Sequence, residues 1–298
     1  MKELFKYIIT KPVAWKSWVG SGLLLLVVTS CFEEDKLDET VKTEDDPTTT
    51  LDIYIDDNFT QEYGIAIRYR YVDNFVEVGQ SVTPPKLDVV RPMLDLVDKY
   101  WIEVYEAVPS GETYFRRYVP AELVFLGGLI YNGDGTVTLG TADAGARIVF
   151  TDVNSIDVND DEWLLRQLHT VYHEFAHIVH QNDKLPTGFE EIAASGYSSA
   201  GSWFNLTDEE ALERGFVSPY ATSSPNEDFA ETIAFYMAEA DFFDTYINQE
   251  DNCTTAACEE RNQGRLLILE KLNAIKEHYL KSTGVDLDDL RAAVQAIL

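Results

Sequence analysis

The sequence predicts an α+β fold, with strands concentrated in the first half of the domain and helices in the second. Two observations support this prediction. Between residues 51 and 152, short apolar runs of strand length are separated by turn residues. After Asp160, apolar residues recur mostly at helical spacing. We therefore expect a small mixed or antiparallel sheet and one long helix in the N-terminal half, followed by a mostly helical C-terminal half.

The strand-bearing half contains several recognisable segments. The runs 123–126 and 147–150 are apolar and short, which is typical of buried strands. A turn-forming stretch, 132–135, precedes the run 136–139 and indicates a hairpin. Two earlier segments complete this half. The pattern of residues 63–78 alternates and suggests strands, and the pattern of 92–108 indicates an amphipathic helix.

Helix starts are marked in the second half by residues that cap orphan backbone N–H groups. Asp160 or Asp161 precedes a long apolar-periodic stretch that runs to Val179. Ser223 or Ser224 precedes Pro225, and proline is tolerated in a first helical turn. The remaining signals are a capping box at 207–210 and a long amphipathic helix at 265–280.

The N-terminus has the pattern of a bacterial lipoprotein signal. Four lysines precede the apolar run 23–28, and small residues precede Cys31. The apolar run is too short for a comfortable membrane span, although an uncleaved anchor is the alternative. We predict a signal peptide at 1–30, lipidation of Cys31 and an acidic flexible tether at 31–50.

The acidic residues just after Cys31 resemble the surface-export signal of some Gram-negative outer-membrane lipoproteins. The predicted location is therefore the outer membrane, with the protein exposed at the cell surface rather than on the periplasmic face. The remaining chain, 51–298, is expected to form one domain, with an upper subdomain at about 51–182 and a helical lower subdomain at about 183–298.

Charge and cysteine usage restrict the partners. A net charge of −29 disfavours nucleic acid and anionic membrane surfaces, so membrane attachment is expected through the lipid anchor only. Beyond Cys31, only Cys253 and Cys258 remain, and they form either a small-loop disulfide or two free thiols. A cysteine metal site is disfavoured because neither residue is near a histidine in the sequence.

The run His173-Glu174-Phe175-Ala176-His177 predicts a zinc site. Histidines four positions apart project from the same face of a helix, one turn apart, and this is the spacing that two ligands of a tetrahedral Zn²⁺ need. Glu174 lies about 100° away around the helix axis, where it can reach a water at the metal without being a ligand. We predict one Zn²⁺ held by His173 and His177, with Glu174 as the general base that takes a proton from the attacking water.

A second run, around residue 227, supplies the third ligand that a two-histidine site needs. Glu227 is our choice because it lies in the first turn of a predicted helix after Pro225. Glu231 follows one turn later on the same face, where it can accept an N–H from a ligand histidine and fix its tautomer. Acidic residues in a first helical turn also serve the helix dipole, which is the ordinary alternative for this pair.

Other candidates stay open at this point. Asp183 occupies the place of a third ligand in an HExxHxxGxxD pattern, but His180 stands where that pattern turns at glycine. Glu190 and Glu191 could return to the metal after a turn at Pro186. Three further histidines have either a structural or a solvated alternative: His169 and His180, which lie near the ligand stripe, and His278 in a C-terminal helix.

These two runs resemble the gluzincins, zincin-like enzymes in which a glutamate on a later helix completes HExxH. Asn226, Glu227 and Glu231 match the later motif position by position, which implies that Asn226 and Glu231 support the ligands. In the lethal-factor-like subgroup a tyrosine seven residues before the glutamate ligand faces the metal. That position is Tyr220, which the resemblance implies as the donor to the developing oxyanion.

More widely, the chain resembles the substrate import-associated zinc metallohydrolase lipoproteins. The phrases that carry the resemblance are 131–133, 139–142, 173–181, 215–218 and 227–231. Membership implies a peptidase acting on polypeptide beside a TonB-dependent importer and its substrate-binding lipoprotein. Two alternatives are an importer-associated binding lipoprotein with structural or vestigial zinc, and a zinc hydrolase of a non-peptide amide or ester.

Overall fold

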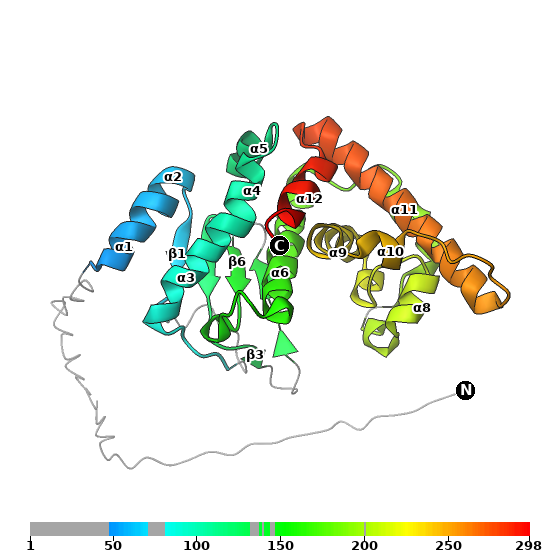
Figure 1. Ribbon diagram of the computed structural model, residues 1–298, viewed down its shortest axis with the longest axis horizontal. Coiled ribbons are helices and arrows are strands. Elements are labelled where there is room, and N and C mark those ends of the chain that lie inside the picture. Colours follow the sequence, from blue (N-terminus) through cyan, green and yellow to red (C-terminus); the bar gives the residue numbers. More distant parts are fainter. Residues whose placement is uncertain (1–47, 71–80, 132–136, 139, 144–146, 200) are drawn as a thin grey trace, which may run out of the picture. The chain divides into compact units, whose positions relative to one another are not determined.

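A four-stranded sheet in the order β1-β2-β6-β5 forms the strand-bearing half of the domain (Figure 1). The computed structural model describes residues 48–70, 81–131, 137–138, 140–143, 147–199 and 201–298. Strands β1, β2 and β6 are parallel, and β5 is antiparallel to β6. A separate pair, β3 with β4, is antiparallel. The strand bounds are Ala66–Arg68 (β1), Glu122–Phe125 (β2), Ile130–Tyr131 (β3), Val137–Thr138 (β4), Gly140–Asp143 (β5) and Arg147–Phe150 (β6).

The predicted α+β class and mixed sheet are confirmed. The buried strands expected at 123–126 and 147–150 are β2 and β6. Strand β1 lies inside the stretch 63–78, of which residues 71–80 lie outside the described residues. The turn at 132–135 also lies outside them, although β3 and β4 on either side pair as a hairpin requires. The features predicted for residues 1–47, including lipidation of Cys31, lie outside the described residues as well.

The helices of this half lie around the sheet. The stretch expected at 92–108 begins earlier, at Leu87, and continues without a break through a π-helical turn to Glu106. Pro92 is the sixth residue of α3 rather than its start, at the cost of one backbone hydrogen bond. The bounds are Thr50–Ile55 (α1), Asp56–Thr60 (η1), Gln61–Tyr63 (α2), Leu87–Val97 (α3), Asp98–Ile102 (η3), Glu103–Glu106 (α4), Gly111–Tyr118 (α5) and Val153–Ser155 (η4).

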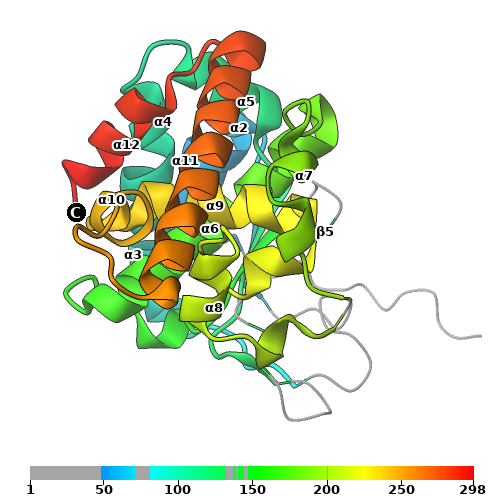
Figure 2. The same cartoon turned by 90° about the vertical axis from the view of Figure 1, so that its right-hand side faces the viewer.

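From Asp161 onward the described chain is helical apart from its connections (Figures 1 and 2). Helix α11 exceeds the predicted 265–280 at both ends, and a disulfide joins Cys253 to Cys258 at its start. The bounds are Asp161–Asp183 (α6), Phe189–Ile192 (α7), Ala194–Gly196 (η5), Trp203–Asn205 (η6), Asp208–Glu213 (α8), Tyr220–Ser223 (η7), Pro225–Ala238 (α9), Phe242–Tyr246 (α10), Ala256–Thr283 (α11) and Leu287–Gln295 (α12).

The predicted helix caps are present. Asp160 accepts hydrogen bonds from the backbone N–H groups of Glu162 and Trp163, and Ser224 accepts one from Glu227 N. Thr207 and Glu210 form the predicted capping box of α8. A further box, between Thr49 and Asp52, starts α1, so the last residues of the predicted tether belong to the folded unit that begins at Thr48.

Helix α6 is fixed in the core by the side opposite its histidines. Phe175, between the two histidines of the HExxH run, is buried, and its ring packs against aromatic rings from three preceding helical segments: Trp101, Tyr105, Tyr114 and Phe115. Because these rings interlock edge to face, the helix cannot rotate about its axis without opening the core. The histidine face of α6 is thereby directed at α9.

Helix α9 packs across α6, and α11 packs against α7, α8, α9 and α12 (Figure 2). One continuous hydrophobic cluster includes residues from both halves, and a smaller cluster of Val124, Leu126, Ile130 and Val149 covers the other face of the sheet. Within the described residues, no helix combines the length and the apolar character that a membrane crossing requires.

Candidate metal centre

Two crossing helices bring the predicted ligands together. His173 and His177 lie one turn apart on α6, and Glu227 lies in the first turn of α9, where Ser224 and Pro225 start the helix. The Nε2 atoms of the two histidines are 3.0 Å apart, and Oε2 of Glu227 lies 3.2 Å from His173 Nε2 and 3.1 Å from His177 Nε2. These three atoms therefore form a nearly equilateral triangle.

The triangle fits a zinc ion. A tetrahedral Zn²⁺ with bonds of about 2.0–2.2 Å separates its ligand atoms by about 3.3–3.6 Å, only a few tenths of an ångström more than the separations here. Two imidazoles and one carboxylate are also the donor set of catalytic zinc sites, which leave the fourth position to water or substrate. All three side chains are at most 22% exposed. Among the described residues, these three form one of two groups with metal-ligand spacing.

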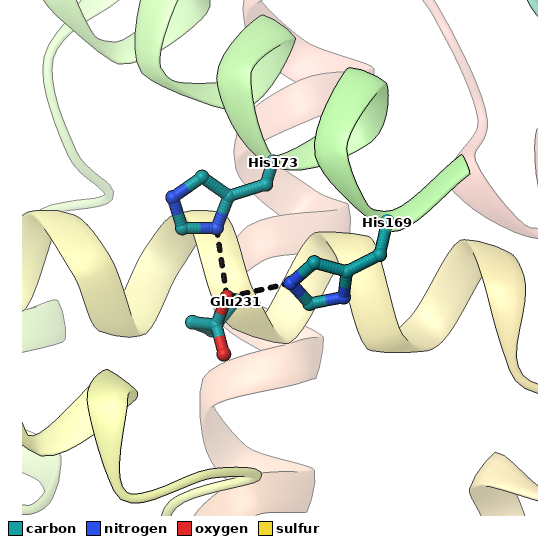
Figure 3. A group of neighbouring side chains, drawn as sticks. All are labelled: His169, His173 and Glu231. Carbon is teal, nitrogen blue, oxygen red and sulfur yellow. Dashed lines mark hydrogen bonds and ion pairs between the residues drawn. The ribbon is translucent and has the colours of Figure 1, made fainter. Parts of the chain in front are cut away.

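The other group contains His169, His173 and Glu231, and the Glu231 carboxylate contacts both rings (Figure 3). Oε1 of Glu231 forms a hydrogen bond with His169 Nε2 at 2.8 Å and lies at ion-pair distance, 2.8 Å, from His173 Nδ1. Ser218 donates to the other oxygen at 2.5 Å. In a neutral His173 ring, the carboxylate next to Nδ1 favours the tautomer with its proton on Nδ1, and the proton-free Nε2 then faces Glu227 and His177.

His177 is oriented in the same way by a different partner. Its Nδ1 lies 2.9 Å from Nε2 of His180. Burial, followed by the neighbouring His177, lowers the pKa of His180 to about 4, so His180 is neutral and can accept the N–H of His177. Each ligand histidine thus has a partner that leaves its Nε2 free for the metal.

Glu174 is buried next to the ligands but is not one of them. Its carboxylate makes no hydrogen bond within the described part of the chain, and burial raises its pKa despite the nearby histidines. A carboxylate that is poorly solvated and free of partners is a stronger base than one in water. This arrangement suits a residue that accepts a proton from water at the metal.

Tyr220 lies at the edge of the same group. Its ring stacks on that of His173 with 6.0 Å between centroids, and its side chain is 37% exposed. Burial and the Glu227 carboxylate raise the pKa of Tyr220, so its phenol keeps its proton and can donate it in a hydrogen bond. The predicted oxyanion donor therefore stands beside a metal ligand.

The rival third ligands lie elsewhere. Asp183 accepts a hydrogen bond from Tyr118 and pairs with Arg117 at 3.3 Å, and Glu190 and Glu191 are exposed on α7. Asn226 is exposed in the first turn of α9, with no side-chain hydrogen bond among the described residues, so its supporting role stays a prediction. His278 is half-buried on α11 and belongs to neither group of candidate ligands.

A buried ion pair stands directly behind the glutamate ligand, and sequence reasoning missed it. Nζ of Lys271 lies 2.7 Å from Oδ2 of Asp228, and both side chains are 0% exposed. Tyr197 donates to the same oxygen at 2.8 Å, and Lys271 also donates to the carbonyl of Gly215 at 2.7 Å. The signal was a lysine among apolar residues on the inner face of a helix, with Ile268 and Ile275 one turn on either side.

The charges of the site predict how the metal-free protein responds to pH. Burial alone would lower the pKa of His173, but Glu227 and Glu231 raise it from 6.5 to about 10. Protonation of His173 therefore favours the folded state, and this stabilisation is fully present below pH 6.5 and is lost as the pH rises toward 10. We expect the melting temperature of chelated protein to fall between pH 6.5 and 10, and zinc-loaded protein to lack this decline, because the metal replaces the proton. Thermal scans across this range test it, and a flat profile for the chelated form contradicts it.

Two histidines on one core helix and a glutamate on a crossing helix, with the spacing of metal ligands, indicate a zinc-binding metalloprotein. A family model described as "Putative zinc-binding metallo-peptidase" matches residues 44–288, and the chain belongs to this family. The chain is similar to a crystal structure described as "a putative zinc-binding metallo-peptidase from Bacteroides caccae ATCC 43185", with 25% sequence identity and a TM-score of 0.66. The similarity covers 82% of this chain and 90% of that chain. No curated protein matches the chain.

Proposed function

We propose that the protein is a zinc-dependent peptidase with one metal ion, and that it hydrolyses peptide bonds of polypeptide substrates. The observation that carries this proposal is the convergence of His173, His177 and Glu227 within 3.0–3.2 Å of one another, with the unpartnered Glu174 carboxylate buried beside them. A site that only held a structural ion would have no use for a free base at that place.

The proposed roles follow from the contacts. His173, His177 and Glu227 hold the ion, while Glu231 and His180 keep the two imidazoles in the binding tautomer. A zinc ion bound there supplies Lewis acidity, which polarises the substrate carbonyl and makes water more acidic. Glu174 takes the proton of the attacking water and delivers it to the departing amine. Tyr220 donates a hydrogen bond to the oxygen that gains negative charge.

We also propose a setting for this activity, which rests on the sequence and the family resemblance given above. Lipidation at Cys31 would attach the protein to the outer membrane, at the cell surface, through the acidic stretch 31–50. There it would shorten polypeptides for a TonB-dependent importer and its substrate-binding lipoprotein. Globomycin-sensitive processing and labelling with a palmitate analogue test the anchor, and loss of both signals is expected in Cys31→Ser.

Metal content and cleavage of a mixed peptide library test the proposed activity together. We expect one zinc per chain in the wild type, and cleavage that chelation abolishes and added zinc restores. Glu227→Ala removes one of three ligands and is expected to lose both the metal and cleavage. Asp183→Asn, which alters the rejected ligand candidate at the end of the same helix as the histidines, is the matched control and should keep both.

Three outcomes separate the competing functions. Zinc binding without cleavage of any peptide contradicts the peptidase proposal and favours a binding protein. If no peptide is cleaved but small amides or esters are hydrolysed, the protein is a zinc hydrolase of non-peptide substrates. Full metal content in Glu227→Ala would show that the third ligand is wrongly assigned.

A further inference from the structure

A row of aromatic rings runs from the metal ligands to the protein surface. The ring of Tyr220 stacks on His173, the ring of Trp203 lies 5.0 Å from that of Tyr220, and Phe204 follows at 6.0 Å from Trp203. His173 is 7% exposed, Tyr220 37% and Phe204 65%, while Trp203, which lies between the last two in the row, is half-buried. Large apolar side chains exposed together at the rim of a buried polar site are typical of ligand-binding surfaces.

The segment that carries Trp203 and Phe204 is fixed to the turn that carries Tyr220. Ser198 N donates to the carbonyl of Thr222 at 2.8 Å, and Thr222 Oγ1 donates to Ser198 Oγ at 3.0 Å. Within the segment, hydroxyl and backbone hydrogen bonds join Ser199 to Ser202, and Leu206 N donates to the carbonyl of Trp203 at 2.9 Å. These bonds fix the backbone that carries the two aromatic residues before any ligand arrives, which lowers the ordering entropy lost on binding.

We propose that Trp203 and Phe204 form a substrate subsite that receives a bulky apolar side chain, preferably aromatic, of the polypeptide residue next to the scissile bond. This inference rests on the proposed function. The occupant is assigned from position, because the row begins at the ring of a metal ligand and the reacting carbonyl must lie at that ligand set. It is also assigned from chemistry, because aromatic faces and edges without a charged partner favour apolar and aromatic groups. Trp203 and Phe204 would therefore determine specificity, and Tyr220 would separate this subsite from the reacting atoms.

Cleavage-site profiling with a mixed peptide library tests the subsite. The wild type should favour Phe, Tyr, Trp or Leu at one fixed position beside the cleaved bond. In Trp203→Ala/Phe204→Ala we expect KM for such peptides to rise about tenfold or more, and the preference at that position to be lost. The kcat/KM for peptides with alanine at the same position should fall by a much smaller factor than that for the aromatic peptides, because alanine does not fill the subsite.

Phe243→Ala is the matched control. Phe243 is an exposed aromatic residue of α10 that packs against Tyr236 and Phe242, and its removal should leave the preference unchanged. A second measurement avoids turnover. In a Glu174→Gln background, binding of a phenylalanine-containing peptide should change the tryptophan fluorescence, because it changes the surroundings of Trp203. The same peptide should bind about tenfold more weakly once Phe204 is replaced by alanine.

The results separate this inference from the function on which it rests. Cleavage by the wild type with a preference that survives in Trp203→Ala/Phe204→Ala contradicts the subsite alone, as does equal peptide binding with and without Phe204. Absence of cleavage of every peptide by the zinc-loaded wild type contradicts the proposed function, and the subsite with it.

Discussion

Replacing Glu174 by glutamine is expected to lower kcat about 100-fold to 10,000-fold, the usual range for loss of a general base. Glutamine has nearly the same shape as glutamate but cannot accept a proton from water at neutral pH. Because Glu174 makes no hydrogen bond within the described residues, the substitution leaves no partner unsatisfied. Metal content and melting temperature should therefore remain close to those of the wild type. Steady-state kinetics and metal analysis on the same preparation measure both quantities.

The matched control is Glu190→Gln. Glu190 is an exposed glutamate on α7, so the same loss of charge there should leave kcat within about twofold, as for most surface substitutions. Unchanged turnover in Glu174→Gln with full zinc content would mean that another group takes the proton. A joint loss of zinc and turnover would instead place Glu174 among the groups that hold the site together.

The helical period explains how the sequence alone could group the candidate ligands. His173, His177, Glu227 and Glu231 are spaced by single turns, so the sequence alone places each pair on one helix face. Residue spacing within one helix does not predict which side chains meet between two helices. Ser218 and His169 both meet Glu231, but the first lies in the connection before α9 and the second had a solvated alternative. The crossing of α6 and α9, fixed by the aromatic rings around Phe175, decides these contacts.

The fold shows the same division between local and distant information. Apolar runs predicted β2 and β6, and capping residues predicted the starts of α6, α8 and α9. The hairpin signals did not indicate that β1, β2 and β6 pair in parallel, because parallel neighbours are joined by long crossovers. The crossover from β1 to β2 runs through α3, α4 and α5, and the connection from β2 to β6 runs through β3, β4 and β5. The predicted start of α3 at Pro92 was wrong, because proline is found in the first turn of a helix more often than at its sixth residue.

Loss of the lysine behind the metal ligand is expected to have the largest effect on stability. Lys271→Met removes the charged partner of Asp228 and leaves a carboxyl group that is 0% exposed. Within the described residues, Tyr197 still donates a hydrogen bond to it at 2.8 Å. Removing one partner of a buried pair costs about 3–5 kcal/mol of unfolding free energy. Lys276→Met on the same helix is the control, because its pair with Asp288 is partly exposed and worth at most about 1 kcal/mol. Urea unfolding of the three proteins at one pH gives the comparison.

The pH dependence of this loss distinguishes an unpaired charge from a packing defect. Even beside Lys271, burial raises the pKa of Asp228 from 3.8 to about 6, and without the lysine the pKa rises further. A carboxyl group whose pKa is higher in the folded than in the unfolded state stabilises the fold when the pH lies below the unfolded-state pKa. This contribution is lost as the pH rises through the folded-state pKa. The deficit of Lys271→Met should therefore be smaller near pH 4 than near pH 8. Lys271→Met/Asp228→Leu should recover most of the stability, because replacing a whole buried pair by apolar residues is often neutral. A deficit that is equal at both pH values and persists in the double variant would mean that the lysine acts through packing on Phe216 and not through its charge.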